Sequence, residues 1–456
     1  MSLRALSELP SLPTLSPLGH LTELRKRPLP LLARIVRELG ELGRVRLGRT
    51  TALFVAAPAL VQELLVDHAE DYVKNRSLTV FARPVLGDGL VVSQGDKHRK
   101  RRAIVAPAFL PKRIARYADA IIEETDRVLA RFPAQGEVDL ADEMTRLTLH
   151  VVASTLIHTE VAGEVQRVGE AFTAASEALM KLVRSFLPLP PSWPTPSGRK
   201  LLRSARELDQ VVYRILRERR ARGGDPGDLL SLLMQARDED GRALDDEALR
   251  DEVMTLLLAG HETTANALTW ALQLVAISPE VALALKTEVD QVLGDRPPRY
   301  EDLPRLNTCL QVFKETLRLY PPAYLMGRIA QRESVLGGYR IPRGQLVFVN
   351  IYGMHRRAEL FPQAQAFRPA RFDDQAERRW AKSSYIPFGV GPRICVGNHF
   401  ALMEGQLVLA RCAQRLELAG AVARVAEAEP LITLRPEGRV HMRVMPRAQH
   451  AATLRN

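Results

Sequence analysis

The sequence contains little cysteine: Cys309, Cys395 and Cys412 are the only three in 456 residues. Three scattered cysteines cannot form a disulfide framework, and an odd number is typical of proteins in a reducing compartment. The spacing between Cys395 and Cys412 matches no zinc-binding pattern. We therefore expect a cytoplasmic protein in which one thiol could serve as a ligand.

The sequence also lacks a long apolar run at its start. Residues 1–28 contain no stretch long enough for a signal peptide or a membrane span, so we expect no transmembrane anchor. We find no internal repeat, no low-complexity tract and no evident linker. The sequence predicts a single domain over residues 1–456, with a lead-in segment over about residues 1–25, and we expect a monomer.

Acidic residues are outnumbered: 53 Asp and Glu stand against 64 Lys and Arg, a net charge of +11. The basic residues are dispersed, with local clusters at 96–102 and 217–222. No motif places an arginine-bearing helix for reading a nucleic-acid groove, so we expect no nucleic-acid partner. An excess of positive charge favours an acidic protein partner or an anionic surface.

Helical periodicity dominates residues 60–335. The longest predicted helix, residues 245–277, begins at a plausible N-cap, Asp245, and ends at Ser278-Pro279. It is apolar on nearly all sides and should be the buried central helix. The proline-rich segment 187–198 is typical of a surface loop or lid.

The remaining segments predict small sheets around the helices. Alternation around Gly48 predicts a hairpin at 43–58, short strands follow residue 335, and 431–447 is typical of another hairpin. An irregular stretch at 357–394 leads to a final helix from about residue 396. The fold class is mainly α with small β-sheets.

The segment "PFGVGPRICVGNHFA", residues 387–401, places Cys395 in a glycine-rich loop that enters a helix. A thiolate is a strong metal ligand, and the start of a helix stabilises its negative charge. Glycines allow the backbone to turn sharply or to approach something flat. A buried structural cysteine beside an ordinary turn is the alternative interpretation.

The pattern Phe388-Gly389-x-Gly391-x-Arg393-x-Cys395-x-Gly397 resembles the haem-binding loop of cytochromes P450. The resemblance implies haem b, with Cys395 as the proximal ligand of the iron, as thiolate ligation in this family requires. It also implies that Arg393 reaches a haem propionate, that Phe388 packs by the sulfur and that Gly397 lets the backbone come close to the cofactor.

Buried haem carboxylates require cations or donors as partners. His98 and Arg102 lie four residues apart, on one face of a predicted helix. The resemblance implies that both hold one propionate and that Arg328 holds the other. Taken alone, a basic helix turn is usually a solvated face.

The central helix carries "AGHETTANA", which is similar to the family's oxygen-activation motif. Gly260 costs about 1 kcal/mol in a helix interior, and the threonines can bond back to the preceding turn, so this turn could be loosened. The resemblance implies that Ala259 and Gly260 leave room for dioxygen and that Glu262 and Thr263 deliver protons. His261, at the variable position, is expected to face away.

Glu315 and Arg318 form Glu-x-x-Arg on an apolar predicted helix, and Arg371 lies in "FRPARF". Such a pair is common on exposed helices, but crowding by apolar neighbours predicts burial here. The resemblance implies that the three residues form a structural triad that fastens this helix to the segment before the cysteine loop.

These elements occur in the family's order over most of the chain, so the chain is identified as a member of the cytochrome P450 family. The expected lack of a membrane anchor makes it similar to the soluble bacterial type. A weaker similarity points to bacterial carotenoid or fatty-acid hydroxylases. The implied activity is a monooxygenase that inserts one oxygen atom of O2 into a lipophilic small molecule by hydroxylation or epoxidation. The substrate pocket is expected to draw on 75–92, 183–198, 256–259 and 323–326.

Electrons are expected from a ferredoxin or flavodoxin with its NAD(P)H-dependent reductase, because the chain has no room for a reductase of its own. Exposed cations among Lys97, Lys100, Arg101, Arg411 and Arg415 are expected to frame the docking surface. Two alternatives stay open. A peroxide-driven peroxygenase would lack the acid–threonine pair, and a non-catalytic haem sensor of gas or redox state would not consume O2.

Overall fold

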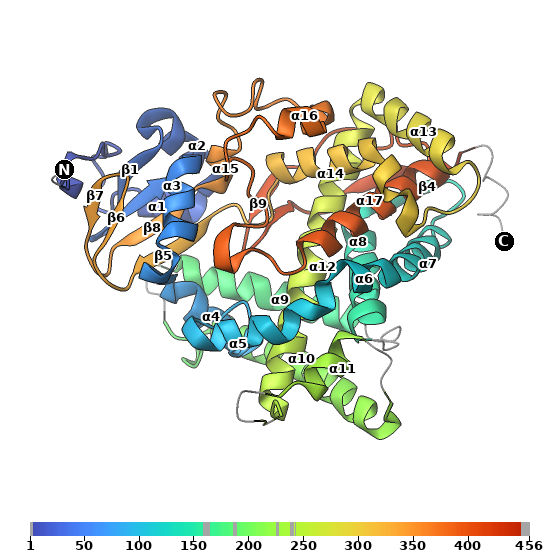
Figure 1. Ribbon diagram of the computed structural model, residues 1–456, viewed down its shortest axis with the longest axis horizontal. Helices are drawn as coiled ribbons and strands as arrows, with labels where there is room; N and C mark the ends of the chain where they lie inside the picture. Colours follow the sequence, from blue (N-terminus) through green and yellow to red (C-terminus); the bar gives the residue numbers. More distant parts are fainter. Residues whose placement is uncertain are drawn as a thin grey trace.

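The architecture is taken from a computed structural model of the chain, which describes residues 3–157, 165–185, 189–224, 228–237, 241 and 243–447. Figure 1 shows a helical part that makes up most of the molecule and a smaller part, beside the N-terminus, where most of the strands gather. The predicted fold class, mainly α with small sheets, is confirmed.

The α-helices of the described residues are α1 (Leu21–Lys26), α2 (Pro28–Leu39), α3 (Pro58–Gln62), α4 (Arg76–Leu86), α5 (Gly95–Val105), α6 (Pro111–Ile114), α7 (Ala118–Leu129), α8 (Leu140–Val152), α9 (Val165–Arg184), α10 (Pro196–Arg222), α11 (Leu229–Gln235), α12 (Asp246–Ala276), α13 (Pro279–Leu293), α14 (Asn307–Leu319), α15 (Ile351–Met354), α16 (Asp374–Glu377) and α17 (Asn398–Arg415). The strands are β1 (Leu42–Leu47), β2 (Thr50–Val55), β3 (Tyr72–Lys74), β4 (Gly136–Asp139), β5 (Met326–Ala330), β6 (Ser334–Leu336), β7 (Tyr339–Ile341), β8 (Leu346–Val349), β9 (Ala428–Pro430), β10 (Leu434–Pro436) and β11 (His441–Val444).

The largest sheet has five strands in the order β1-β2-β8-β5-β3. The hairpin expected at 43–58 is confirmed, because β1 and β2 pair antiparallel around Gly48, which has a φ of 65°. β8 joins β2 in parallel, and β5 pairs antiparallel with both β8 and β3. The last pairing sets Lys74 directly opposite Arg328.

Helix α12 crosses the middle of the molecule, as predicted (Figure 1). Its N-cap is Asp245, whose side chain accepts a hydrogen bond of 2.7 Å from the backbone N–H of Ala248. The helix ends before Ser278, and α13 begins at Pro279. Most of its side chains are buried, including Trp270, because helices cover it on several sides.

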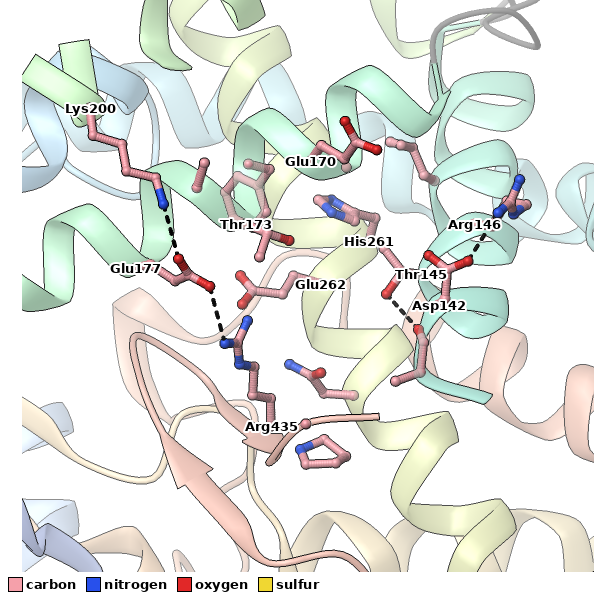
Figure 2. Close-up of a pocket in the computed structure, with 18 residues that line it drawn as sticks. Asp142, Thr145, Arg146, Glu170, Thr173, Glu177, Lys200, His261, Glu262 and Arg435 are labelled. Atoms are coloured by element: carbon pink, nitrogen blue, oxygen red, sulfur yellow. Dashed lines mark hydrogen bonds and ion pairs between the residues drawn. The ribbon is translucent and has the colours of Figure 1, made fainter. Parts of the chain in front are cut away.

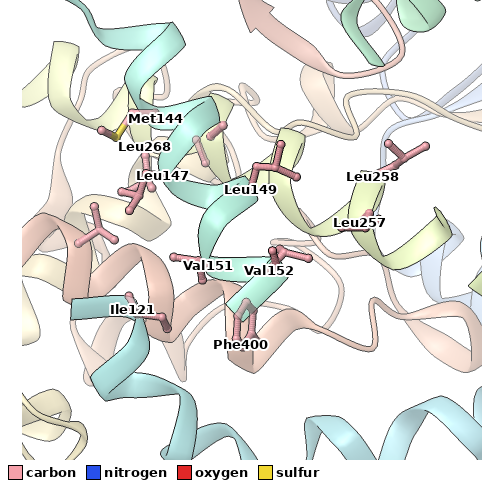
Figure 3. Packing of buried hydrophobic residues seen from close by; sticks show 14 of the residues in the cluster. Ile121, Met144, Leu147, Leu149, Val151, Val152, Leu257, Leu258, Leu268 and Phe400 are labelled. Atoms are coloured by element: carbon pink, nitrogen blue, oxygen red, sulfur yellow. The ribbon is translucent and has the colours of Figure 1, made fainter. Parts of the chain in front are cut away.

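Helices α7, α8, α12 and α17 pack around a common core (Figure 3). Leu147 and Val151 of α8, Leu268 of α12 and Ile121 of α7 are fully buried. Burial of aliphatic side chains of this size is worth about 1.5–3 kcal/mol each. This core holds α12 in a fixed position next to the helix that follows Cys395.

The prediction of a hairpin at 431–447 is wrong. β10 pairs with β9, whereas β11 pairs with β4, so the two strands belong to separate two-stranded sheets. The alternation of this segment indicated extended structure but could not identify the partner strands.

No single helix in the described ranges is long and apolar enough to cross a bilayer. The consecutive helices α12 and α13 satisfy the length and composition only together, across a bend of 107°.

Candidate functional site

The loop of residues 388–397 turns back on itself before α17 begins. The backbone N–H of Cys395 donates a 2.9 Å hydrogen bond to the carbonyl of Phe388. Gly389 and Gly391 have φ values of 74° and 75°, and a Cβ on Gly391 would lie 2.1 Å from the carbonyl oxygen of Leu65. Both positions therefore require glycine. Gly397, at φ −93°, precedes the first turn of α17 and has no such constraint from the protein.

Cys395 differs from the other two cysteines. Cys309 and Cys412 are buried, and burial raises the pKa of Cys412 to about 12. Cys395 has exposed surface, although protein atoms surround its thiol on several sides. This desolvation raises the pKa of the Cys395 thiol, and a hydrogen bond from the backbone of Gly397 and the charge of Arg102 oppose the rise. Cys395 is thus the cysteine available as a ligand.

Basic side chains from three other segments lie near Arg393 of this loop: Lys74 of β3, His98 and Arg102 of α5, and Arg328 of β5. Arg102 donates to the carbonyl of Ile394 at 2.7 Å, and Arg393 donates to that of Ser93 at 2.7 Å. The structure therefore brings together the four basic residues that the sequence indicated and adds Lys74. Sequence reasoning missed Lys74 because only the β3–β5 register sets it beside Arg328.

The positive charges of these side chains repel one another. Burial and neighbouring cations lower the pKa of His98 to about 4, of Lys74 to about 7, and of Arg328 and Arg393 to about 10. Within the described ranges none of the five forms an ion pair with a carboxylate. A cluster of buried and half-buried basic side chains without acidic partners suits an anionic ligand, which would favour their charged forms. The two propionates of a haem fit this requirement.

An apolar cavity of about 330 Å³ lies against the middle of α12. Ala259, Glu262 and Thr263 form its α12 side. The other lining residues come from four further segments: Thr79, Ala82, Val85, Leu86, Val91, Val92, Phe172, Ala175, Ser176, Leu179, Pro322, Ala323, Ile432 and Thr433, with Thr255 and Leu258 from α12 itself. Three of the four segments expected to form the pocket do so. The fourth, 183–198, contributes no lining residue among its described positions, and 186–188 lie outside the described residues.

Two segments that sequence reasoning missed complete this cavity. Helix α9 provides Phe172 and Leu179, and the turn before β10 provides Ile432 and Thr433. Both are ordinary apolar or polar positions in the sequence, and no local pattern marks them as pocket residues.

Glu262 is held by a side chain from the C-terminal region. The hydroxyl of Thr433 donates to Glu262 Oε1 at 2.7 Å, and Asn266 Nδ2 donates to Thr433 Oγ1 at 3.1 Å. Burial raises the pKa of the Glu262 carboxyl, and the bond from Thr433 and the charge of Arg435 oppose the rise. The neighbouring Thr263 donates to the carbonyl of Ala259 at 2.7 Å, the back-bonding that its position predicts.

A second cavity, of about 480 Å³, lies on another side of Glu262 (Figure 2). Charged and polar side chains line most of it, and Glu262 borders both this cavity and the apolar one. Figure 2 shows Glu262 and Glu177 pointing toward Arg435. Arg435 lies 3.8 Å from Glu177, which also pairs with Lys200 at 3.1 Å. An acidic group therefore connects an apolar chamber with a polar one.

The turn at Gly260 and His261 faces α8 more than the apolar cavity. A Cβ on Gly260 would lie 3.0 Å from Val152, so close packing of α8 explains this glycine. The hydroxyl of Thr148 donates to the carbonyl of His261 at 3.0 Å. The His261 ring borders the polar cavity and contacts Phe172, and burial lowers its pKa to about 4. Ala259 therefore lines the apolar cavity, and Gly260 allows the close approach of α8.

Glu315, Arg318 and Arg371 meet in the interior. Glu315 and Arg318 are fully buried and form a bidentate pair, with distances of 2.7 and 2.8 Å. Arg371 lies 3.3 Å from Glu315, and Arg318 also donates to the carbonyls of His355 and Ala364 at 2.7 Å each. The group therefore joins α14 to the irregular segment before the cysteine loop.

Two basic residues expected on the docking surface are not available there. Arg101 is 7% exposed and pairs with Glu252 at 2.5 Å, and Arg411 is 5% exposed and pairs with Asp126 at 2.7 Å. Lys100 is exposed. Arg101 lies three residues after His98 and was expected on a solvent-exposed side of α5. The sequence could not reveal that α12 covers that side of the helix.

Comparisons with known proteins agree with this geometry. The family model described as Cytochrome P450 matches residues 9–440. Cyclooctatin synthase from Streptomyces melanosporofaciens is 37% identical over 87% of this chain and 87% of its own length. Cyclooctat-9-en-7-ol 5-monooxygenase from the same organism is 34% identical over 88% and 87%, respectively. Pentalenene oxygenase from Streptomyces avermitilis is 33% identical over 86% and 87%.

Proposed function

We propose that this chain, which belongs to the cytochrome P450 family, oxidises a compact cyclic compound of the terpenoid type in its apolar cavity. As a member of the family it is a haem-thiolate monooxygenase. Its haem b supplies the chemistry that inserts one oxygen atom of O2 into a lipophilic small molecule. Electrons reach it from a redox partner. The observation that carries the substrate proposal is the apolar lining of the cavity next to Thr263.

The cavity supports a small, rigid substrate. Its volume of about 330 Å³ is at the low end of the range that ligand pockets of about 300–1,000 Å³ occupy. Its walls are mainly aliphatic, and Phe172 is the aromatic residue among them. Two relatives are named for oxidising pentalenene and cyclooctat-9-en-7-ol. A compact unsaturated ring compound suits such a chamber better than a long flexible chain, which loses more conformational freedom on binding.

We assign the cofactor contacts as follows. Cys395 ligates the iron through its thiolate, with Phe388 beside the sulfur and Gly397 where the backbone approaches the ring. The basic side chains hold the propionates: His98, Arg102, Arg328, Arg393 and, in addition, Lys74. Support comes from the cation cluster without acids beside the exposed cysteine. We assign Glu315, Arg318 and Arg371 the role of holding the cysteine loop's supporting segment in place.

We assign Glu262 and Thr263 to proton transfer. Burial raises the pKa of Glu262, so this carboxyl can carry a proton at a higher pH than an exposed glutamate. Thr433 and Asn266 fix its orientation, and the polar cavity gives water a place next to it. Thr263 lies on the apolar side and can pass the proton onward. An intact acid–threonine pair argues against the peroxygenase and sensor alternatives.

We further propose a ferredoxin or flavodoxin, with its NAD(P)H-dependent reductase, as electron donor. Lys100 of α5 and Lys112 of α6 are exposed, and α6 packs against α17, the helix that follows Cys395. A positive surface there suits an acidic partner. A single domain, a monomeric state and a cytoplasmic location complete the proposal, the last supported by three cysteines that form no disulfide.

The substrate proposal is tested by optical titration of the holoenzyme. Pentalenene, cyclooctat-9-en-7-ol and palmitic acid are added separately, and the shift of the haem absorption band measures binding. We expect saturable shifts with the two cyclic compounds and a much weaker response to palmitic acid. A strong response to palmitic acid alone would contradict the substrate class and leave the monooxygenase assignment unaffected.

The proton-transfer assignment is tested with Thr263→Ala and Thr263→Ser. Removing the hydroxyl should lower product per electron consumed by about a hundredfold, the low end of what a positioned proton donor contributes. Hydrogen peroxide should account for the difference, while Thr263→Ser, which keeps the hydroxyl, should remain close to the wild type. Full coupling in Thr263→Ala would remove Thr263 from the mechanism.

A further inference from the structure

The loop of residues 87–92, which joins α4 to α5, lies with its backbone against the beginning of α12. The N–H of Asp88 donates to Asp251 Oδ2 at 2.7 Å, and that of Leu90 donates to Glu252 Oε2 at 3.1 Å. A Cβ on Gly87 would lie 1.8 Å from Asp251 Oδ1. Two successive side chains of α12 therefore accept hydrogen bonds from this loop at very close range.

Both acids are buried, and each lies beside an arginine. Glu252 is 1% exposed and Asp251 is 4% exposed. Arg101 of α5 lies 2.5 Å from Glu252 Oε1, and Arg250 lies 3.0 Å from Asp251 Oδ1. Arg250 also donates through Nε to Asp209 of α10 at 2.6 Å. We call Arg101, Asp251 and Glu252 the clamp. It fastens the loop to α12 and, through Arg101, to α5.

The loop that the clamp holds forms one wall of the apolar cavity. Val91 and Val92 line the cavity directly, next to Leu86 at the end of α4. None of the three clamp residues lines it. A shift of the loop by an ångström would move this wall against any molecule in the cavity, and displacements of that size change reaction rates strongly.

We propose that Asp251 and Glu252 are positioning residues that set the place of the 87–92 loop over the apolar cavity and so determine which carbon atom of the substrate is oxidised. They act through backbone N–H groups and never touch the substrate. The inference rests on the proposal that the apolar cavity is the substrate site. It does not depend on which compound binds there.

Two charge-balanced double variants test the Arg101–Glu252 part of the clamp with and without its hydrogen-bond acceptor and leave Asp251 unchanged. Arg101→Gln/Glu252→Gln keeps a side-chain oxygen for the N–H of Leu90, whereas Arg101→Met/Glu252→Met removes it at similar volume. Neither leaves an unpaired buried charge. Asp246→Asn, which removes an exposed ion pair with Arg220 at the start of the same helix, is the control.

The first measurement is amide hydrogen exchange of the holoenzyme. In the wild type the N–H groups of Asp88 and Leu90 should exchange more slowly than that of Val91. The Met/Met variant should exchange at Leu90 about tenfold faster, because a buried hydrogen bond is lost, with little change elsewhere. The Gln/Gln variant and Asp246→Asn should match the wild type. Fast exchange at both N–H groups in the wild type would overturn the proposal without any variant.

The second measurement is the ratio of oxidation products from pentalenene or palmitic acid, whichever the enzyme turns over. The Met/Met variant should change the ratio several-fold, and the Gln/Gln variant should keep it. A changed exchange rate with an unchanged product ratio would show that the clamp is only structural. Because either compound can report the ratio, failure of the terpenoid assignment is distinguishable from failure of this inference.

Discussion

At the scale of single residues, the arginines of this protein's interior have two kinds of partner. Arg318 and Arg411 are buried and each contacts a carboxylate at 2.7 Å, which suits a structural role. Arg328 and Arg393 lie among other basic side chains, and each donates a hydrogen bond to a backbone carbonyl instead. The partner of a buried cation thus indicates its purpose more reliably than its burial does.

Glu404 of α17 is a buried acid that should make the stability of the folded protein depend on pH. It is fully buried, its carboxyl faces Thr264, and no hydrogen bond of good geometry from the described residues reaches either oxygen. Burial raises the pKa of this carboxyl well above its ordinary value, and the Thr264 hydroxyl opposes the rise only in part. The folded protein therefore keeps a proton that the unfolded chain releases above about pH 4.3.

Glu404→Gln should consequently become more stable than the wild type as pH rises. The stabilisation from the protonated carboxyl is fully present below the unfolded pKa and is lost as pH rises toward the folded pKa. The glutamine does not titrate, so the difference in melting temperature should be small at pH 5 and larger at pH 8. Glu123→Gln, at an exposed position of α7, is the control and should show no such trend. A constant difference would contradict a protonated Glu404.

At the scale of elements, two glycines of the cysteine loop should tolerate substitution differently. Gly391→Ala should cost about 1–2 kcal/mol for the left-handed backbone alone, and its Cβ would clash with the Leu65 carbonyl 2.1 Å away. We expect a lower melting temperature and less bound haem. Gly397→Ala is the matched comparison: its φ is −93° and the nearest atom, on Phe109, lies at 3.5 Å. If Gly397→Ala loses haem while remaining stable, the constraint there comes from the cofactor.

Elements defined by nearby residues were predictable from the sequence. The cap at Asp245 and the apolar length of α12 lie within one segment, as does the turn around Gly48. The contacts of Lys74 and Thr433 were not predictable, because each depends on a strand or helix far away in the chain. The alternation of apolar and polar residues likewise indicated that β11 is extended. It could not identify β4 as the partner strand, because this alternation shows only which side chains share a face of the sheet.

At the scale of the whole molecule, the net charge of +11 should attract an acidic redox partner mainly through the surface around Lys100 and Lys112. Lys100→Glu/Lys112→Glu should slow reduction by an acidic ferredoxin about tenfold at low ionic strength, because steering by charge raises association rates by at least that factor. The loss should shrink as salt is added. Stopped-flow reduction measures both effects, and substrate affinity should not change.

Lys26→Glu/Arg49→Glu is the matched control, since both residues are exposed and lie beside the sheet. It changes the net charge by the same amount. Equal slowing in the two double variants would show that total charge matters and that no particular surface is used.

The pairing of distant strands also determines when the site can form during synthesis. Ala52 pairs with Leu346, Val138 pairs with Met442, and Thr433 holds Glu262. A growing chain emerges from its N-terminus, so each contact must wait until its later partner, Leu346, Thr433 or Met442, has left the ribosome. We therefore expect haem binding to follow synthesis of most of the chain, because the proposed ligand Cys395 and Thr433 both lie toward its C-terminus. A nascent chain halted before residue 388 would have most of its helices but would lack Cys395, the proposed ligand of the cofactor.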